Sequence, residues 1–240
     1  MSLQIHVKRM IKTIPIVGPL ATAINRKLFA LRYVFPGSHD YWINRYRFGG
    51  NSGAGSYKQL AEYKAAILNA FVKEKNIESI IEYGCGDGNQ LLLAQYPNYI
   101  GFDVSDTAIS LCKTKFAHDS CKSFKLVGEY GEERADLTLS LDVIYHLVED
   151  RVFCEYMERL FDSADHFVII YSSNSNVQQG EHAPHVKHRT FTGWVERKRS
   201  EWRLRQYIPN RYPFTGNLDE GSFCDFYIYE MTSNSRISGS

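Results

Sequence analysis

From Ser56 onward, apolar residues follow two alternating spacings. Short runs rich in β-branched and aromatic residues, typical of buried strands, occur at SIIEY (79–83), NYIGFD (98–103), SFKLV (123–127), DLTLSL (136–141) and HFVIIY (166–171). Segments with helical spacing alternate with these runs, for example RVFCEYMERLF (151–161). The alternation predicts βαβ units, and therefore an α/β fold with a mostly parallel sheet covered by helices on both faces.

Both ends of this region carry further signals. Ser56 and Gln59 form an S-x-x-Q pattern, which predicts a capping box at the start of the first core helix. WRLRQYI (202–208) and FCDFYIY (223–229) have no helical segment between them, which predicts an antiparallel pair at the edge of the sheet. We therefore expect four regions: a basic extension (1–40), a glycine-rich lid (41–56), a catalytic domain (57–232) and a flexible tail (233–240).

Composition narrows the class of protein. A chain of 240 residues suits one catalytic domain with an appendage. Its net charge of +1 gives no indication that the protein as a whole binds nucleic acid. The five cysteines are odd in number and contain no C-x-x-C pair, which argues against a disulfide framework or structural zinc. A reducing cytoplasm fits this usage best.

The basic extension differs from the rest of the chain in its charge. Residues 1–39 contain six lysines and arginines and no acid, and no apolar run approaches the roughly 20 residues that a bilayer span needs. The segment also shows no signal-peptide cleavage site. Two interpretations stay open: peripheral contact with an anionic membrane at the inner face of the plasma membrane, or an extension that packs on the domain or is mobile.

Two glycine clusters are candidates for ligand binding. The first, FGGNSGAGSY (48–57), has the glycine spacing of a phosphate-binding P-loop but lacks its lysine, which disfavours a nucleoside triphosphate. The second, SIIEYGCGDGNQ (79–90), places Glu82 and three glycines at the carboxyl end of the first strand, where doubly wound folds bind ligands. Its G-x-G-x-G spacing differs from the G-x-G-x-x-G of dinucleotide sites.

Asp103 ends the next strand, nineteen residues after Gly84. A carboxylate at this position can accept both hydroxyls of an unphosphorylated ribose, which indicates an adenosine-like ligand. The alternative is that the glycines only form a tight turn and Asp103 caps a helix.

The E-x-G-x-G-x-G pattern with a downstream acidic strand end resembles the class I S-adenosylmethionine (SAM)-dependent methyltransferases, over roughly residues 57–229. The resemblance implies a Rossmann-like, doubly wound, seven-stranded sheet that ends in an antiparallel hairpin. It implies that Glu82 and the glycine loop meet the methionine part of SAM, that Asp103 holds the ribose, and that Glu129 reaches the adenine amine. The full set of cofactor residues implied in this region is Glu82, Gly84, Gly86, Gly88, Asp103, Val104, Glu129 and Ser140.

The first glycine cluster also resembles, more specifically, small bacterial methyltransferases found with cell-surface polysaccharide genes, which share the GG-x-SG-x-GSY loop and a SLDVIYHL segment. In that reading the segment folds over the cofactor. Hydrogen-bond donors to the cofactor would come from Arg45, Tyr46, Ser52 or Ser56. A flexible linker is the alternative.

The SLDVIYHL segment (140–147) supplies candidates for catalysis. Methyl transfer to a poor nucleophile such as a sugar hydroxyl needs a base, and histidine is the usual one near neutral pH. We predict that His146 is this base, with Asp142 either orienting it or facing the methyl site, and with Tyr145 contacting the acceptor. The alternative is that Asp142 caps a turn and His146 is a packed loop residue.

The segment EHAPHVKHRTF (181–191) carries His182, His185 and His188, but no standard zinc motif, and we predict no metal there. We expect His185, His188 and Arg189 to bind the acceptor instead. Between Glu181 and Arg211, eight basic residues outnumber three acids, which would attract an anionic acceptor.

These observations favour an O-methyltransferase that converts SAM to S-adenosyl-L-homocysteine (SAH) and modifies a sugar of a bacterial glycan or glycolipid. Methylation of RNA or of a small molecule, and a non-catalytic SAM-binding regulator, remain alternatives. Nucleic acid is disfavoured because stacking aromatic residues are not interleaved with a basic groove.

Overall fold

The structure is a computed structural model that describes residues 35–178 and 183–232. The chain from Gly37 onward forms one compact unit. Our expectations for most of the basic extension, for His182 and for the tail after Thr232 lie outside the described residues. None of the helices in the described part of the chain has the length and apolar character of a membrane span.

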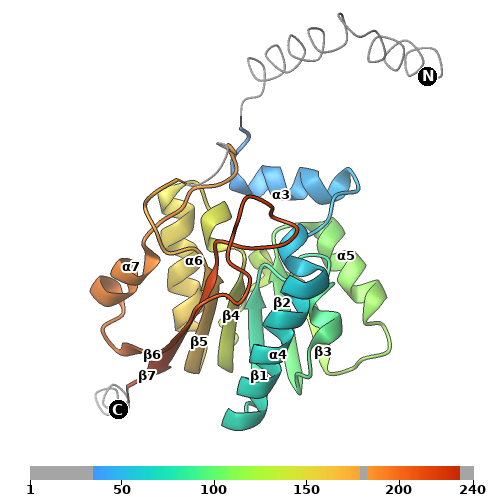
Figure 1. The fold of residues 1–240 in the computed structure, drawn as a ribbon. Helices are drawn as coiled ribbons and strands as arrows, with labels where there is room; N and C mark the ends of the chain where they lie inside the picture. Colours follow the sequence, from blue (N-terminus) through green and yellow to red (C-terminus); the bar gives the residue numbers. More distant parts are fainter. Residues whose placement is uncertain (1–34, 179–182, 233–240) are drawn as a thin grey trace, which may run out of the picture. The chain divides into compact units, whose positions relative to one another are not determined.

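Alternating helices and strands make up this unit (Figure 1). The α-helices are α3 (Ser38–Arg47), α4 (Lys58–Lys75), α5 (Asp106–Lys115), α6 (Asp150–Asp162) and α7 (Phe191–Lys198). The strands are β1 (Ser79–Tyr83), β2 (Asn98–Asp103), β3 (Lys122–Leu126), β4 (Ala135–Leu141), β5 (Ala164–Ser172), β6 (Trp202–Ile208) and β7 (Asp225–Met231). Short 3-10 helices are η1 (Ala54–Ser56), η2 (Gln90–Leu93), η3 (Val127–Glu129) and η4 (Ile144–His146).

The seven strands form one sheet in the order β3-β2-β1-β4-β5-β7-β6. The first five are parallel, whereas β7 is antiparallel to β5 and β6 is antiparallel to β7. The predicted doubly wound sheet and its C-terminal antiparallel pair are therefore confirmed. The strand order reverses between β1 and β4, and this switch point is where open α/β sheets bind ligands.

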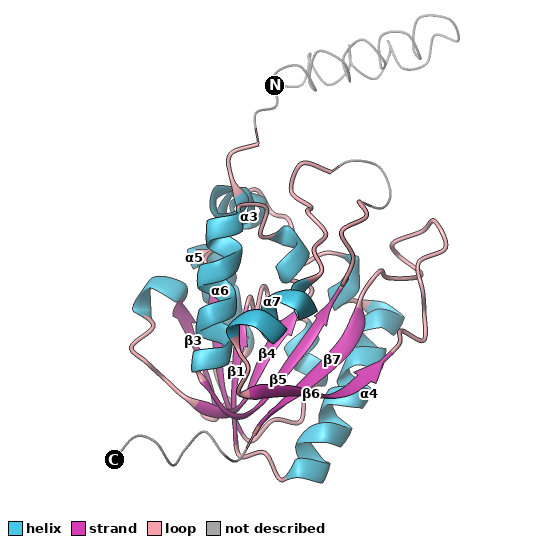
Figure 2. Ribbon diagram, turned by 90° about the vertical axis from the view of Figure 1, so that its left-hand side faces the viewer, coloured by secondary structure: helices cyan, strands magenta, loops and turns pink. Residues whose placement is uncertain are grey.

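Helices cover both faces of the sheet. α4 and α5 pack on one face through residues such as Leu68, Phe71 and Ile109. α6 and α7 pack on the other through residues such as Met157 and Trp194, and Figure 2 shows these two helices side by side in front of the strands. Each fully buried aliphatic or aromatic side chain contributes roughly 1.5–3 kcal/mol of transfer free energy, so the two layers hold the strand ends in place.

Two local predictions were wrong. α4 begins after Tyr57 without a side-chain cap, because Ser56 belongs to η1 and the Gln59 amide donates to the carbonyl of Glu220 at 2.8 Å. In addition, β1 connects to β2 through η2 instead of an α-helix. The connection is short and Pro97 stands just before β2, which leaves too little chain for a full helix and its loops.

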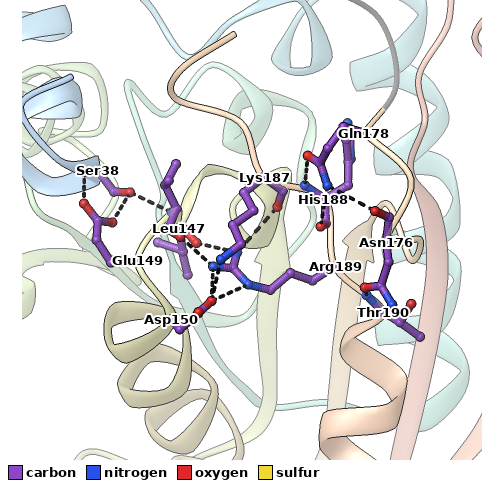
Figure 3. Close-up of polar contacts among 11 residues, drawn as sticks. Ser38, Leu147, Glu149, Asp150, Asn176, Gln178, Lys187, His188, Arg189 and Thr190 are labelled. Atoms are coloured by element: carbon purple, nitrogen blue, oxygen red, sulfur yellow. Dashed lines mark hydrogen bonds and ion pairs between the residues drawn. The ribbon is translucent and has the colours of Figure 1, made fainter. Parts of the chain in front are cut away.

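Helix α3, which we did not predict, lies across the carboxyl ends of the strands (Figure 1). Its first residue, Ser38, donates from its amide to Glu149 Oε1 at 2.9 Å and from its hydroxyl to Glu149 Oε2 at 2.6 Å (Figure 3). The Ser38 hydroxyl also accepts from the amide of Val148 at 2.8 Å. A carboxylate thus satisfies donors at the helix N-terminus and ties α3 to the start of α6.

Candidate active site

A cavity of about 340 Å³ lies at the switch point, between the ends of β1, β2 and β4 and the inner side of α3. This volume is within the range of small-molecule sites. Many of the residues singled out from the sequence line it: Tyr46, Ser52, Ser56, Glu82, Gly84, Gly86, Asp103, Val104, Asp142 and His146.

Asp103 is held between the glycine loop and the start of α5. Its Oδ2 accepts from the Gly86 amide at 3.0 Å and its Oδ1 from the Ser105 amide at 2.9 Å. Burial raises the pKa of this carboxyl. Each oxygen has a second lone pair for a ligand hydroxyl. The N-cap of α5 is Ser105, whose hydroxyl accepts from the Ala108 amide, so helix capping does not explain Asp103.

Glu82 lies deeper in the same cavity. The hydroxyl of Tyr99 donates to its Oε2 at 2.6 Å, and burial raises the pKa of Glu82 to about 7. A cation bound nearby would favour the ionised form of this carboxyl.

Gly86 shows why the first strand ends in glycines. It has a φ of +58°, and a Cβ there would come within 2.3 Å of the Ser52 hydroxyl and 2.8 Å of the Tyr46 hydroxyl. Gly88 does not line the cavity; a Cβ there would meet Cys112 Sγ at 2.9 Å, so its role is to let α5 pack closely.

The glycine-rich segment 48–57 is joined to the glycine loop through Asp87, which the sequence analysis missed. The amide of Ser52 and the hydroxyl of Tyr57 donate to Asp87 Oδ2 at 3.1 and 2.7 Å. The Asp87 amide donates back to the Ser52 hydroxyl at 3.0 Å. Burial alone would raise the pKa of Asp87, but these hydrogen bonds outweigh it and lower the pKa. Arg45 points along the same segment and donates to the Asn51 carbonyl at 2.6 Å.

Asp142 ends β4 in the left-handed region, with φ of +61°. Its Oδ2 accepts from Lys64 Nζ at 2.6 Å, and its Oδ1 accepts from the Tyr145 hydroxyl at 3.1 Å. Lys64, on α4, is fully buried and lines the cavity. The sequence analysis missed it, although a lysine between Leu60 and Leu68 on one apolar helix face is a visible signal.

His146 lines the cavity on the side of α3. Its Nδ1 lies 3.0 Å from the carbonyl oxygen of His185, which can only accept, so Nδ1 carries the proton and Nε2 keeps its lone pair. Burial lowers the pKa of His146 to about 4. The Trp42 ring meets the imidazole edge-on, with centroids 4.8 Å apart. His146 is therefore a neutral hydrogen-bond acceptor at physiological pH.

Several predicted site residues lie away from the cavity lining. The Glu129 carboxylate accepts from the Leu126 amide at 2.7 Å, and the buried Ser140 hydroxyl accepts from Tyr156 at 2.7 Å. His188 Nδ1 lies 2.6 Å from the Ser173 hydroxyl. Arg189 donates to the Leu147 and Val148 carbonyls and to Asp150 (Figure 3).

Arg189 thus anchors the segment from residue 183 to 190 to the start of α6, and His188 anchors it to Ser173, the residue after β5. His185 supplies the carbonyl for His146 and stacks on Tyr41 at 4.3 Å. Within the described ranges, no three histidine, cysteine or acidic side chains gather in a way that could hold a metal ion.

Comparisons with known proteins show what this chain is similar to. Residues 81–169 match the family model described as "Methyltransferase domain". The N-methyltransferase NodS from Bradyrhizobium japonicum WM9, solved with SAH, superposes with a TM-score of 0.60 at 12% identity, covering 81% of this chain and 98% of NodS. No curated protein matches the sequence.

Two further solved structures share the fold. Magnesium protoporphyrin IX methyltransferase (ChlM) from Synechocystis PCC 6803, with bound SAH, has a TM-score of 0.59 at 14% identity and covers 81% of this chain and 98% of its own. The methyltransferase domain of bacterial CtHen1 has a TM-score of 0.55 at 18% identity and covers 71% of this chain and 98% of its own.

The chain thus contains a methyltransferase domain, and it shares its fold with methyltransferases solved with the cofactor SAM or its product SAH. The cavity fits that cofactor: a carboxylate at the end of β2 suits a ribose, Val104 and Val127 offer apolar contact to a base, and Glu82 and Asp142 suit a sulfonium cation.

Proposed function

We propose that the chain O-methylates a sugar of a bacterial cell-surface glycan or glycolipid intermediate. The observation that carries the proposal is His146, a neutral imidazole whose Nδ1 is occupied by the His185 carbonyl and whose ring lines the cofactor cavity. A hydroxyl needs such a base, whereas an amine or a thiolate is nucleophilic without one. The proposal therefore selects an oxygen acceptor.

Bound SAM supplies a methyl group already activated on a sulfonium. The residues of this chain orient the acceptor, exclude water and take its proton. Nε2 of His146 accepts the proton of the attacking hydroxyl, while the His185 carbonyl stabilises the resulting imidazolium through Nδ1–H. Trp42 and Tyr46 of α3 line the cavity, and their rings would exclude water on that side.

Aromatic rings near His146 support a sugar as the acceptor. Trp42 and His146 line the cavity, and Tyr41 and His185 stack behind them. Aromatic faces offer apolar contact to the C–H side of a sugar ring while polar groups bind its hydroxyls. His188 and Arg189, which we expected to bind the acceptor, have structural partners and are not part of this proposal. Membrane contact through residues 1–39 remains a prediction.

The test is transfer of isotope-labelled methyl from SAM to a bacterial glycolipid and polysaccharide fraction, followed by hydrolysis and mass spectrometry of the monosaccharides. We expect the label in an O-methyl sugar. Label released by ribonuclease would support the RNA alternative, and label in a small-molecule fraction would support that acceptor class. Cofactor binding without transfer to any fraction would support a regulator.

A further inference from the structure

Lys64 is a buried cation for which the fold has no evident need. Its side chain is 1% exposed, and Asp142 Oδ2 accepts one of its three N–H donors at 2.6 Å. The ring of Tyr171 lies 5.2 Å from Nζ. Among the residues that the structure describes, Nζ makes no other hydrogen bond. Two donors are thus left for another acceptor on the cavity side.

Stability alone is a weak reason for this ion pair. Removing an ammonium and a carboxylate from water costs several kcal/mol per ion, and apolar replacements of such pairs are often neutral or stabilising. The neighbours one turn away on α4, Leu60 and Leu68, are fully buried, so an apolar side chain would suit position 64 as well. Asp142 also holds a left-handed conformation, which costs of order 1–3 kcal/mol for a residue other than glycine.

The sheet order shows what lies near this pair. Asp103 ends β2, the glycine loop follows β1, and Asp142 ends β4, in the spatial order β2-β1-β4. A cofactor whose ribose is held at Asp103 and which crosses the glycine loop places its amino acid end near β4. Glu82, Lys64 and Asp142 line that end of the cavity.

An amino acid end carries a carboxylate as well as an ammonium. The permanently charged cations among the described lining residues are Lys64 and Arg159. The Arg159 guanidinium lies over the ring of Tyr130, which packs against Phe102 of β2. Lys64 is therefore the cation placed at the β4 end.

We propose that Lys64 binds the α-carboxylate of the cofactor, and that Asp142 and Glu82 meet its α-ammonium group. The Lys64–Asp142 pair then matches the zwitterion of the amino acid end: the carboxylate lies opposite the Lys64 ammonium, and the ammonium lies opposite the Asp142 carboxylate. This inference rests on the cofactor site of the proposed function but not on its acceptor. The inference predicts that the Lys64–Asp142 pair makes the site bind ligands with an α-carboxylate more tightly than ligands without one.

Calorimetry with two ligands tests this directly: SAH, and its decarboxylated analogue, which keeps the amine and lacks only the carboxylate. The full chain is compared with Asp142→Asn and with Lys64→Met/Asp142→Asn, in which no buried charge of the pair remains. Asparagine tolerates the left-handed region, so both variants keep the backbone. Thermal melting and binding of the decarboxylated analogue report whether each variant is folded.

We expect wild type and Asp142→Asn to prefer SAH over the analogue. Relative to Asp142→Asn, the double variant should bind SAH about 10- to 100-fold more weakly, as for a lost charged hydrogen bond, while its affinity for the analogue should stay within about threefold of that of Asp142→Asn. A double variant that keeps the wild-type preference would overturn the role of Lys64 and leave the methyltransferase proposal intact. Wild type that binds neither ligand would overturn both.

Discussion

At the scale of single residues, the environment of His146 decides its chemistry. A solvent-exposed histidine titrates near pH 6.5, but burial lowers the pKa of His146 to about 4. Activity that depends on the neutral form of His146 should therefore not follow the titration of an ordinary, exposed histidine. The neutral form, which is the base, is present at all pH values above about 4.

The first prediction concerns this group. For an acceptor identified by the labelling experiment, kcat/KM should rise with pH through about 4 and stay level through neutral pH. His146→Gln should lower kcat by about 10²–10⁴ with SAH affinity unchanged, because only proton transfer is lost. His166→Gln, at an exposed histidine on β5, is the control. An acid limb near pH 6.5, or full kcat in His146→Gln, would contradict the role.

Sequence spacing identified some residues of the site and missed others for a physical reason. Asp103 and Asp142 end parallel strands, so their places at the cavity follow from the order of strands. Loop side chains are not fixed in this way, and His188 turns to Ser173 while Arg189 binds carbonyls of the loop after β4. Lys64 was missed because a lysine on an apolar helix face indicates a binding site only when the residue that pairs with it is known. The sequence does not show that this residue is Asp142.

At the scale of elements, α3 and the glycine-rich segment act together. α3 carries Trp42 and Tyr46 over the cavity, and the glycine segment binds the loop after β1 through Ser52 and Asp87. Gly55 lies so close to Asp142 that a Cβ would come within 2.6 Å of Oδ2. Such close approach explains why this segment is rich in glycine.

The second prediction tests the anchor of α3. Ser38→Ala removes the hydrogen bonds of its hydroxyl with Glu149 and Val148, worth about 1–2 kcal/mol together, which is roughly 2–8 °C in Tm for a domain of this size. SAH should also dissociate several-fold faster, because α3 covers the cavity. Ser110→Ala, at an exposed position on α5, should change neither quantity. Equal melting and dissociation in Ser38→Ala and wild type would show that the anchor is unimportant.

The strands were predictable because buried parallel strands leave short apolar runs between polar turns. Their ends differ from the predicted ones by no more than two residues. α3 escaped prediction because its sequence, SHDYWINRYR, lacks an apolar stripe; contacts with Glu149 and with the cavity stabilise it instead. The capping box failed because η1 uses Ser56 in a tighter turn.

At the scale of the whole molecule, the cavity joins segments that are far apart in the chain. Residues of α3, α4, the glycine loop, the end of β2 and the end of β4 all line it. A ligand there binds only the folded chain, so it stabilises the entire unit by mass action, by about 2.7 kcal/mol when its concentration is 100 times Kd. Cofactor binding and global folding are therefore coupled.

The most direct test of the central claim is calorimetric titration of SAH into the full chain and into Asp103→Asn. Wild type should bind one SAH, and the variant should bind it about 10- to 100-fold more weakly, because a charged acceptor for the ribose is lost while the shape is kept. Glu129→Gln is the matched control; its carboxylate accepts from the Leu126 amide and lies outside the cavity lining, so its affinity should equal that of wild type. No binding to wild type, or equal affinity in wild type and Asp103→Asn, would contradict the assignment of this cavity to SAM.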